Sequence, residues 1–338
     1  MRKIKVEEAV GFPLCHDVTA MRDGFKGAAF KRGHVITEQD IPELLTLGKR
    51  HVFIWEPGTG EIHEEDAARR LAAMSQVNGA HYTEPSEGKI VLIADQPGLF
   101  RVDTELLRAI NSVGDITIST LPDHYPADKG ARLASMRIVP LVTREERIIE
   151  AERLCAGKQL FDLLPYRKLS AGVIITGSEV YHGRIRDKFE PVVRAKLGAY
   201  PCEILGVTFC DDELEMLNGA IQAYLHQGAE LLILSGGMSV DPDDLTPAAI
   251  AQTEAQVISY GVPSQPGNMT LLAYLGNTAI IGVPGAAICL PTTVFDVLLP
   301  QIFTGLKFTR EDLIRLGDGG LCQLCASCHF PNCTFGRY

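Results

Sequence analysis

The sequence predicts an α/β protein whose most legible part, residues 169–308, is a three-layer domain around a mostly parallel sheet. In this part, short uninterrupted apolar runs alternate with segments whose apolar residues recur at helical spacing. That alternation is typical of βαβ units, in which helices cover both faces of a parallel sheet. Small, hydroxylated or acidic residues follow the apolar runs, and ligands bind at the carboxyl ends of the strands in such sheets.

Composition limits the classes of protein that the chain can represent. Its 338 residues are enough for about two to three domains of roughly 100–200 residues each. With 46% hydrophobic and 22% charged residues, it has the composition of a globular protein that buries substantial cores. The formal net charge of −10 argues against a nucleic-acid partner, which requires a basic face. It does not exclude an anionic small ligand, because backbone N–H groups hold phosphates.

The sequence contains no segment that reads as a membrane span or a secretory signal. The longest apolar stretch, residues 279–290, is interrupted by Pro284 and falls short of the roughly 20 apolar residues a span needs. We therefore expect a cytoplasmic protein without a membrane partner. In a reducing compartment, five scattered cysteines are expected to be buried free thiols, namely Cys15, Cys155, Cys202, Cys210 and Cys289.

Four segments are predicted along the chain: a small α+β N-terminal domain (1–60), an α/β middle domain (61–168), the three-layer domain (169–308) and a Cys-rich metal-binding tail (309–338). Periodicity and turn residues predict the elements of the first two. The expected helices are 39–47, 64–77, 104–113 and 144–155, and the expected strands are 33–37, 51–55, 89–94, 115–120 and 136–142. Thr37 and Asp40 fit the N-terminal cap of the first helix, and Gly48 fits its end.

The third segment is predicted in more detail. Its expected strands are 172–176, 202–208, 231–234 and 279–283, and its expected helices are 187–197, 212–226 and 292–303. The residues that follow the four strands are Thr176-Gly177-Ser178-Glu179, Asp211-Asp212, Gly236-Gly237-Met238-Ser239 with Asp244, and Pro284-Gly285. Because the carboxyl ends of parallel strands meet at one edge of a sheet, we expect these residues to share that edge.

The residue types at this edge suit a phosphate-bearing ligand. Gly236 and Gly237 remove Cβ atoms where backbone must approach a ligand, and Ser239 with nearby N–H groups suits a phosphate. Carboxylates around a phosphate require a divalent cation such as Mg²⁺, or a neutral heterocycle that donates hydrogen bonds to them. The structural alternatives are that glycine-rich turns end strands in any α/β fold, and that Asp211-Asp212 caps the following helix.

Taken together, these segments resemble the molybdopterin-binding domain shared by molybdopterin adenylyltransferases and molybdenum insertases. The similarity rests on Thr176-Gly-Ser-Glu179, Asp211-Asp212, the run from Gly236 to Pro247 and Val283-Pro-Gly285. It covers roughly residues 169–306. The rest of the chain, from Gly11-Phe-Pro-Leu-Cys-His-Asp17 to the cysteine tail, resembles molybdopterin-binding proteins of anaerobic bacteria.

The resemblance implies a transferase of the molybdopterin molybdenumtransferase kind, acting in molybdenum cofactor biosynthesis. It implies molybdopterin or its adenylylated form as ligand, molybdate as a further substrate, Mg²⁺ as a metal, and self-association. It places Glu179, Asp211 and Asp244 as catalytic residues, with Asp211 favoured over Asp212. It places Thr176, Gly177, Gly236, Gly237, Ser239, Pro284 and Gly285 around the cofactor.

Two departures from the family pattern favour a different function. Insertases typically carry Lys-Pro-Gly-Lys where this chain has Gln265-Pro266-Gly267-Asn268, and Asp241 replaces a glycine of the Gly-rich loop. Without the two lysines, capture of an oxyanion loses its positive charges. The alternative function is a non-catalytic carrier or chaperone that delivers molybdenum cofactor to a molybdoenzyme.

The tail contains four cysteines within twelve residues: Cys322, Cys325, Cys328 and Cys333. Two Cys-x-x-Cys steps that share Cys325 predict a closed four-thiolate zinc site. An iron–sulfur cluster is the rival, but the ferredoxin run spaces its last cysteine by three residues and places proline after it. Here the gap is four residues and Pro331 precedes Cys333. The structural alternative is an unstructured tail of free thiols or a disulfide.

His16 and Asp17 in the first segment suggest a catalytic pair, with Lys26, Lys31 and Arg32 as anion contacts. The alternative, a structural histidine and solvated cations, is the favoured interpretation because no spacing rule joins these residues to the third segment.

Overall fold

The computed structural model describes residues 2–22, 25–54, 60–238 and 244–337. The chain forms two compact units: the first contains Met1–Gln96, Phe100–Leu121 and Ala127–Leu163, and the second contains Pro97–Leu99, Pro122–Pro126 and Leu164–Tyr338. The division at Leu163/Leu164 lies close to the predicted boundary at 168/169. In the described part of the chain, no helix is long and apolar enough to cross a membrane.

The N-terminal part of the first unit consists of short elements around a small apolar cluster. They are β1 (Arg2–Lys5), η1 (Val6–Glu8), β2 (Val18–Arg22), β3 (Phe25–Phe30), η2 (Glu38–Asp40), α1 (Ile41–Thr46) and β4 (His51–Ile54). β1 pairs antiparallel with β4, and β2 with β3. The predicted cap is confirmed, because Thr37 and Asp40 form a reciprocal capping box. The expected strand 33–37 is only a single bridge between Pro13 and Val35.

Residues 61–165, most of which belong to the first unit, form twelve elements. They are β5 (Glu61–His63), α2 (Glu64–Met74), β6 (Ala80–Tyr82), β7 (Ile90–Ala94), β8 (Gly98–Val102), α3 (Thr104–Asn111), β9 (Ile116–Thr120), β10 (Tyr125–Ala127), β11 (Arg132–Ile138), β12 (Val142–Arg144), α4 (Glu145–Cys155) and β13 (Phe161–Pro165). The sheet orders are β6-β7-β11-β9, β10-β8-β13 and β12-β5. In the first of these sheets every pairing is antiparallel, which is an α+β arrangement.

One predicted strand in this region is wrong. The expected strand 136–142 is two strands, because β11 ends at Ile138 and β12 begins at Val142. Pro140 lies between them and has no N–H to donate to a ladder, so it interrupts the pairing.

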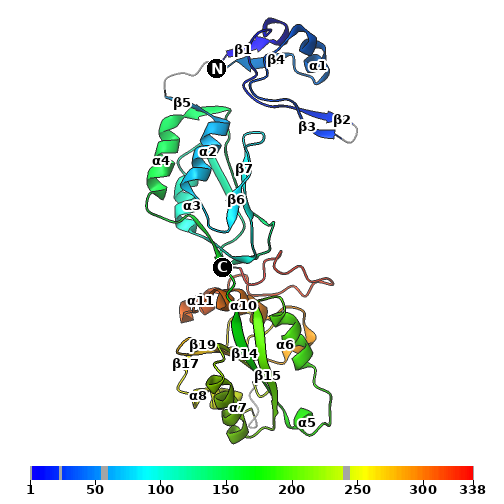
Figure 1. The fold of residues 1–338 in the computed structure, drawn as a ribbon, viewed down its shortest axis with the longest axis vertical. Helices are drawn as coiled ribbons and strands as arrows, with labels where there is room; N and C mark the ends of the chain where they lie inside the picture. Colours follow the sequence, from blue (N-terminus) through cyan, green and yellow to red (C-terminus); the bar gives the residue numbers. More distant parts are fainter. Residues whose placement is uncertain (1, 23–24, 55–59, 239–243, 338) are drawn as a thin grey trace. The chain divides into compact units, whose positions relative to one another are not determined.

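The second unit contains a six-stranded sheet in the order β15-β14-β16-β19-β18-β17. Figure 1 shows the adjacent strands β14 and β15 of this sheet. Its elements are β14 (Leu169–Thr176), α5 (Ser178–Tyr181), α6 (Phe189–Leu197), β15 (Cys202–Cys210), α7 (Leu214–His226), β16 (Leu231–Ser235), α8 (Thr246–Ala251), β17 (Gln256–Tyr260), β18 (Leu271–Leu275), β19 (Thr278–Val283), α9 (Ala286–Cys289), α10 (Val294–Thr304) and α11 (Arg310–Arg315). The four predicted strands, β14, β15, β16 and β19, pair in parallel. The antiparallel strands β18 and β17 were not predicted.

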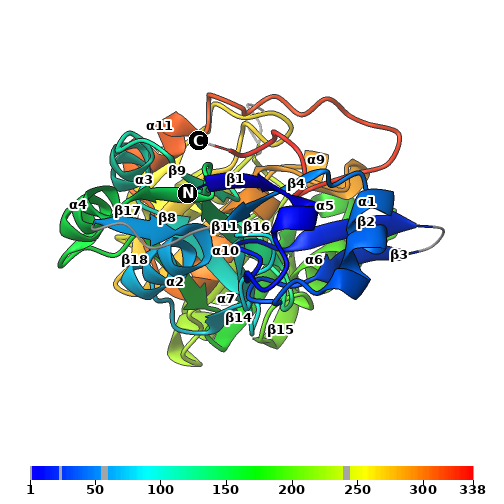
Figure 2. The same cartoon turned by 90° about the horizontal axis from the view of Figure 1, so that it is seen from above.

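Apolar side chains alternate between two cores, one on each face of this sheet. In β16, Leu231 and Ile233 join the core formed with α6, α10 and α11, whereas Leu232 and Leu234 join the core formed with α7 and α8. Because both faces are covered, the strands read as continuous apolar runs. The predicted three-layer domain is confirmed. Seen from above in Figure 2, the C-terminal tail, drawn in red, leaves α11 and passes near α9.

Candidate functional site

The carboxyl ends of the parallel strands meet at one edge of the sheet of the second unit. Thr176 at the end of β14 pairs with Cys210 at the end of β15, and Ser235 at the end of β16 pairs with Val283 at the end of β19. The residues that follow these strands therefore share this edge, as predicted. We call the loops 176–183, 211–213, 261–270 and 284–293, together with residues 236–238 and 244–245, the rim.

The loop 261–270 belongs to the rim because of strand direction. β17 ends at Tyr260 and β18 begins at Leu271, and these two residues pair with each other. Leu271 also pairs with Gly282, near the end of β19. The sequence did not place this loop at the rim, because the β17–β18 hairpin itself was not predicted.

Asp212 joins the ends of β14 and β15. The hydroxyl of Thr176 donates a hydrogen bond to Asp212 Oδ1 at 2.7 Å, and the backbone N–H of Ser178 donates to Oδ2 at 2.9 Å. The Thr176 side chain is buried, so this bond satisfies its hydroxyl inside the protein. Asp212, which the sequence ranked below Asp211, is thus the residue that positions the first rim loop.

Asp211 is held as a carboxylate. Its Oδ1 accepts the backbone N–H of Asp212 at 2.9 Å, and its Oδ2 lies 2.9 Å from His182 Nε2. The Asp212 N–H, followed by the Ser178 hydroxyl and His182, lowers the pKa of Asp211 below its usual value. The alternative that this pair caps a helix is wrong, because α7 is preceded by Glu213 and has no side-chain cap.

The two glycines after β16 are required by the rim's own backbone. Gly236 has φ +87° and Gly237 has φ +55°, a region that favours glycine. A Cβ on Gly236 would overlap the carbonyl oxygen of Thr176, and one on Gly237 would lie 3.0 Å from Thr246 Oγ1. The Thr246 hydroxyl in turn donates to the Gly236 carbonyl at 2.9 Å. The approach of these glycines to a ligand stays a prediction. Ser239 and Asp241 lie outside the described residues.

The negative charge of Asp244 acts on the phenol of Tyr260. Partial burial of the phenol is the first cause, and the charge of Asp244 the second, that raises the pKa of Tyr260. The Tyr260 hydroxyl donates to the carbonyl of Met238 at 3.3 Å. Asp244 does not cap α8, because that helix follows Leu245 and has no side-chain cap. Tyr260, the last residue of β17, lies next to the rim loop 261–270 and was not predicted from the sequence.

The remaining predicted rim residues differ in exposure. Glu179 is exposed on α5. The N–H of Gly177 donates to the Cys210 carbonyl at 3.3 Å, which extends the ladder. Pro284 is buried, whereas Gly285 is exposed and has open space where a Cβ would stand. At the end of β16, directly before the rim, the hydroxyl of Ser235 is fully buried and has no hydrogen-bond partner among the described residues.

The described residues contain no group of three or more His, Cys, Asp or Glu side chains placed to hold a metal ion. At the rim, Asp211 and Asp212 already accept hydrogen bonds from the protein. Glu179 and Asp244 are the other predicted carboxylates of this edge. A Mg²⁺ ion at the rim is therefore compatible with the residue types, but the chain does not present a preassembled site for it.

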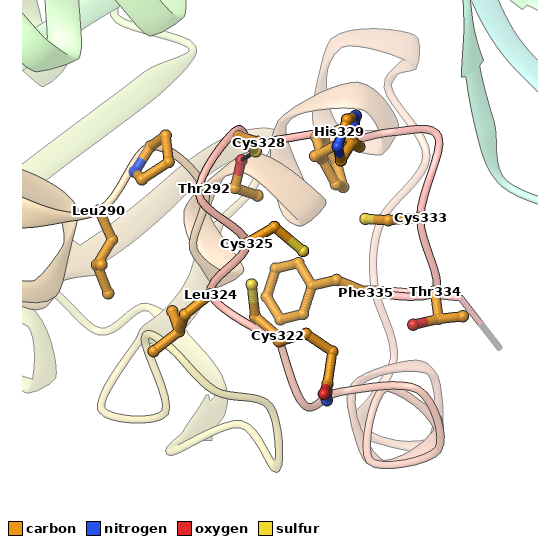
Figure 3. A pocket seen from close by; sticks show the side chains of 13 residues that line it. Leu290, Thr292, Cys322, Leu324, Cys325, Cys328, His329, Cys333, Thr334 and Phe335 are labelled. Carbon is orange, nitrogen blue, oxygen red and sulfur yellow. Dashed lines mark hydrogen bonds between the residues drawn. The ribbon is translucent and has the colours of Figure 1, made fainter.

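The tail cysteines line a single cavity of ≈ 140 Å³, shown in Figure 3. All four predicted ligands, Cys322, Cys325, Cys328 and Cys333, contribute to its wall and are free thiols. Cys328 Sγ lies 3.1 Å from the hydroxyl of Thr292, in the rim loop 284–293.

The five scattered cysteines are free thiols, as predicted. Only three of them, Cys15, Cys155 and Cys210, are buried. Burial raises the pKa of the Cys15 and Cys202 thiols to about 11. The prediction of burial is wrong for Cys202, which is only partly buried, and for Cys289, the last residue of α9, which is exposed.

His16 and Asp17 lie in the first unit at a cavity of ≈ 360 Å³, together with Glu64 and Arg137. Burial first, and then the charge of Lys49, lowers the pKa of His16, which favours the neutral form of the ring. Asp17 Oδ1 accepts the backbone N–H of Arg32 at 2.9 Å, a bond that supports the loop. These contacts agree with the favoured structural interpretation.

Comparisons with known proteins define the class of the second unit. A family model described as a "probable molybdopterin binding domain" matches residues 172–304, so this part of the chain is similar to the domains of that family. A second model, described only as a domain of unknown function, matches residues 3–56.

The chain is similar to several named proteins. A molybdopterin molybdenumtransferase of Synechococcus elongatus is 27% identical over 185 residues, which cover 52% of this chain and 46% of that protein. A CinA-like protein of Mycobacterium sp. is 33% identical over 82 residues, 24% of this chain and 20% of that protein. The chain thus spans less than half the length of these curated relatives. The tungsten cofactor synthesizing protein MoaB from Pyrococcus furiosus has 17% identity and a TM-score of 0.37, covering 43% of this chain and 98% of that one.

Proposed function

We propose that the rim of the second unit binds molybdopterin or its adenylylated form, and that the chain assists the insertion of molybdenum. The observation that supports this most is the convergence of four strand ends at one edge of a domain similar to the molybdopterin-binding family. These ends carry a glycine pair, a buried unpartnered hydroxyl and several carboxylates.

The rim residues divide into two roles in this proposal. Gly236, Gly237 and Ser239 receive the phosphate, because backbone N–H groups of a glycine loop present donors to an anion. The carboxylates of Glu179, Asp211 and Asp244 accept N–H groups of the pterin or hold Mg²⁺ beside the phosphate.

In the proposed reaction, water cleaves the phosphoanhydride of molybdopterin-AMP and gives AMP and the phosphate of molybdopterin. The two dithiolene thiols bind the molybdenum of molybdate, and their protons leave with one molybdate oxygen as water. A bound Mg²⁺ would neutralise charge on the phosphates. The chain's own contribution is the positioning of the two phosphates and the pterin, which is where catalysis of phosphoryl transfer mainly lies.

Incubation of the purified protein with molybdopterin-AMP and molybdate tests this proposal. We expect AMP release that depends on molybdate and Mg²⁺. Gly236→Ala, which disturbs the rim backbone, should abolish release, and Gly219→Ala on the exposed face of α7 should retain it. Failure of the wild-type protein to bind any pterin species would contradict the proposal.

A carrier function is the second candidate, and one observation favours it. Asp211 and Asp212 already accept hydrogen bonds from the protein, and the described residues of the rim loops contain no lysine or arginine to replace the two lysines absent at Gln265 and Asn268. A carrier would bind finished cofactor in the cytoplasm and deliver it to a molybdoenzyme, with self-association of the chain an added expectation. Tight pterin binding without AMP release would select this function. The fluorescence of oxidised pterin released from protein purified out of its host would identify the bound species.

A further inference from the structure

The C-terminal tail has a defined path, although few interactions stabilise it. Between Leu321 and His329 every residue except Cys322 is exposed, and the structure assigns no helix or strand to residues 322–337. Ordering the backbone costs about 1–2 kcal/mol per residue. The buried apolar side chain of the described tail beyond Leu321 is Phe335, at 2% exposure. Apolar burial therefore offsets only a small part of the entropic cost.

Both ends of the tail are tethered to the second unit. At the start, the N–H of Gln265 donates to the Gly320 carbonyl at 2.7 Å, and the N–H of Cys322 donates to the Gln265 carbonyl at 2.8 Å. At the far end, the Tyr125 hydroxyl donates to Asn332 Oδ1 at 2.6 Å, and the Arg337 guanidinium lies over the Tyr125 ring, 4.5 Å from its centroid. Cys325 and Cys328 lie between these tethers, Cys322 belongs to the first tether, and Cys333 lies within the second.

The four cysteines line the same cavity. Figure 3 shows the sulfur atoms of Cys322, Cys325 and Cys333 directed toward the space around the Phe335 ring, with Cys328 beside Thr292. A cavity of ≈ 140 Å³ lined by four thiols has room for a metal ion. The described side chains are not arranged as a ready-made site, so a bound ion would draw the sulfurs together. The exposed loop has no ladder or helix that resists such a movement.

We propose that Cys322, Cys325, Cys328 and Cys333 hold one zinc ion, and that this ion clamps two rim loops. Zinc takes four thiolates at about 2.3 Å in a closed tetrahedron, and such a site contributes folding energy directly. The spacing Cys-x₂-Cys-x₂-Cys-x₄-Cys, with proline before the last cysteine, departs from the ferredoxin run.

The clamp follows from the contacts of the tail. On one side Leu321 forms a bridge with Gln265, in the rim loop 261–270. On the other side Cys328 contacts Thr292, in the rim loop 284–293. The two loops also meet each other, because the N–H of Val294 donates to the Pro266 carbonyl at 3.0 Å. An ion that closes the tail therefore restricts both loops at once. The zinc site does not depend on pterin binding, whereas its effect on affinity rests on the proposed function.

Elemental analysis of the full-length protein, purified without oxygen, tests the site. We expect about one zinc per chain and no visible absorption near 400 nm. Cys325→Ser should lower zinc retention against a competing chelator at least tenfold. Cys289→Ser, which changes an exposed cysteine outside the cavity, should retain zinc like the wild type. Iron with sulfide would overturn the zinc assignment, and the absence of any metal would overturn the site.

Hydrogen exchange of the wild-type protein before and after chelation tests the clamp, and it does not require a variant that folds. Amides of 265–270 and 287–294 should exchange at least tenfold faster without zinc, while those of β14 and β16 stay unchanged. Zinc binding without this change would overturn the clamp and leave the proposed function of the rim untouched. Failure of pterin binding with the change present would leave the clamp standing.

Discussion

The sheet and the tail of the second unit are stabilised in opposite ways. In the sheet, Ile174, Leu232 and Ile233 are fully buried in continuous strands between two helical layers. In the tail, Cys325 and Cys328 are exposed and the chain follows no regular element. Apolar burial at about 25 cal/mol per Å² is enough for the first and is nearly absent from the second. The difference teaches that local order in one domain has two physical sources: apolar burial in the sheet and, in our proposal, metal binding in the tail. The rim loops contact both the sheet and the tail.

The largest effect is expected from a cavity in the sheet. Ile233→Ala removes a fully buried side chain from the central strand β16 and should lower the free energy of unfolding by about 2–5 kcal/mol. Urea unfolding with and without a chelator measures it, and the loss should be the same in both. Val257→Ala, on a side chain 44% exposed, is the control and should change stability by no more than about 0.5 kcal/mol. A cost for Ile233→Ala that depends on metal would contradict the separation of sheet and tail.

The next effect concerns the backbone of the rim. Gly236→Ala places a Cβ against the Thr176 carbonyl in a conformation with φ +87°, and should lower the free energy of unfolding by about 1–3 kcal/mol. Thermal unfolding provides the measurement. The control is Gly219→Ala in α7, where a Cβ meets open space. Because alanine favours a helix more than glycine does, the free energy of unfolding should rise by about 0.5–1 kcal/mol. Equal behaviour of the two variants would show that the rim backbone is less constrained than its contacts indicate.

A charge effect at the rim should be smaller and confined to ligand binding. Asp244→Asn keeps size and removes the carboxylate charge, so Mg²⁺-dependent pterin affinity should fall at least tenfold, about 1.4 kcal/mol. Unfolding should be nearly unchanged, since Asp244 caps no helix. Titration calorimetry with the matched control Asp95→Asn, an exposed aspartate of the other unit, isolates the effect. Affinity like that of the wild type would remove Asp244 from the site.

The smallest effect concerns the pH dependence of stability. Because hydrogen bonds lower the pKa of folded Asp211, its ionised form favours the folded state. The stabilisation should be present above the ordinary pKa of about 3.9 and be lost as the pH falls through the lowered value. The difference in melting temperature between wild type and Asp211→Asn should shrink accordingly. His182→Gln leaves the Asp212 N–H in place and should show only part of this difference. A difference that grows toward low pH would contradict the sign.

The strands of the parallel sheet could be predicted because each is a continuous apolar run. That property follows from burial on both faces, and it survives without knowledge of the partners. The hairpin of β17 and β18 was not predicted. β18, Leu271–Leu275, is a continuous apolar run like the predicted strands, but no element was predicted between residues 246 and 278. β17, Gln256–Tyr260, is a short edge strand with exposed Val257 and Tyr260, so it lacks the continuous apolar run of a strand that is buried on both faces. With the hairpin, Tyr260 and the loop 261–270 were missed.

The candidate site shows the same division. That Thr176, Asp211-Asp212, Gly236-Gly237 and Pro284-Gly285 share one edge follows from strand direction, which periodicity reveals. Which aspartate bonds to the Thr176 hydroxyl depends on sub-ångström placement, and spacing along the chain contains no such information. The helix-capping alternative for Asp211-Asp212 could be rejected only once the first turn of α7 was seen.

By itself, the sequence determined the parallel sheet, its helical layers, the edge at which the four strand ends meet and the presence of four thiols in the tail. These properties depend on local composition and on the order of elements, which a one-dimensional pattern preserves. The tertiary structure alone decided that loop 261–270 joins the rim, that Asp212 positions Thr176, and that the tail contacts Gln265 and Thr292. Those contacts join residues distant along the chain, and their free energy depends on distances that arise only when the layers pack.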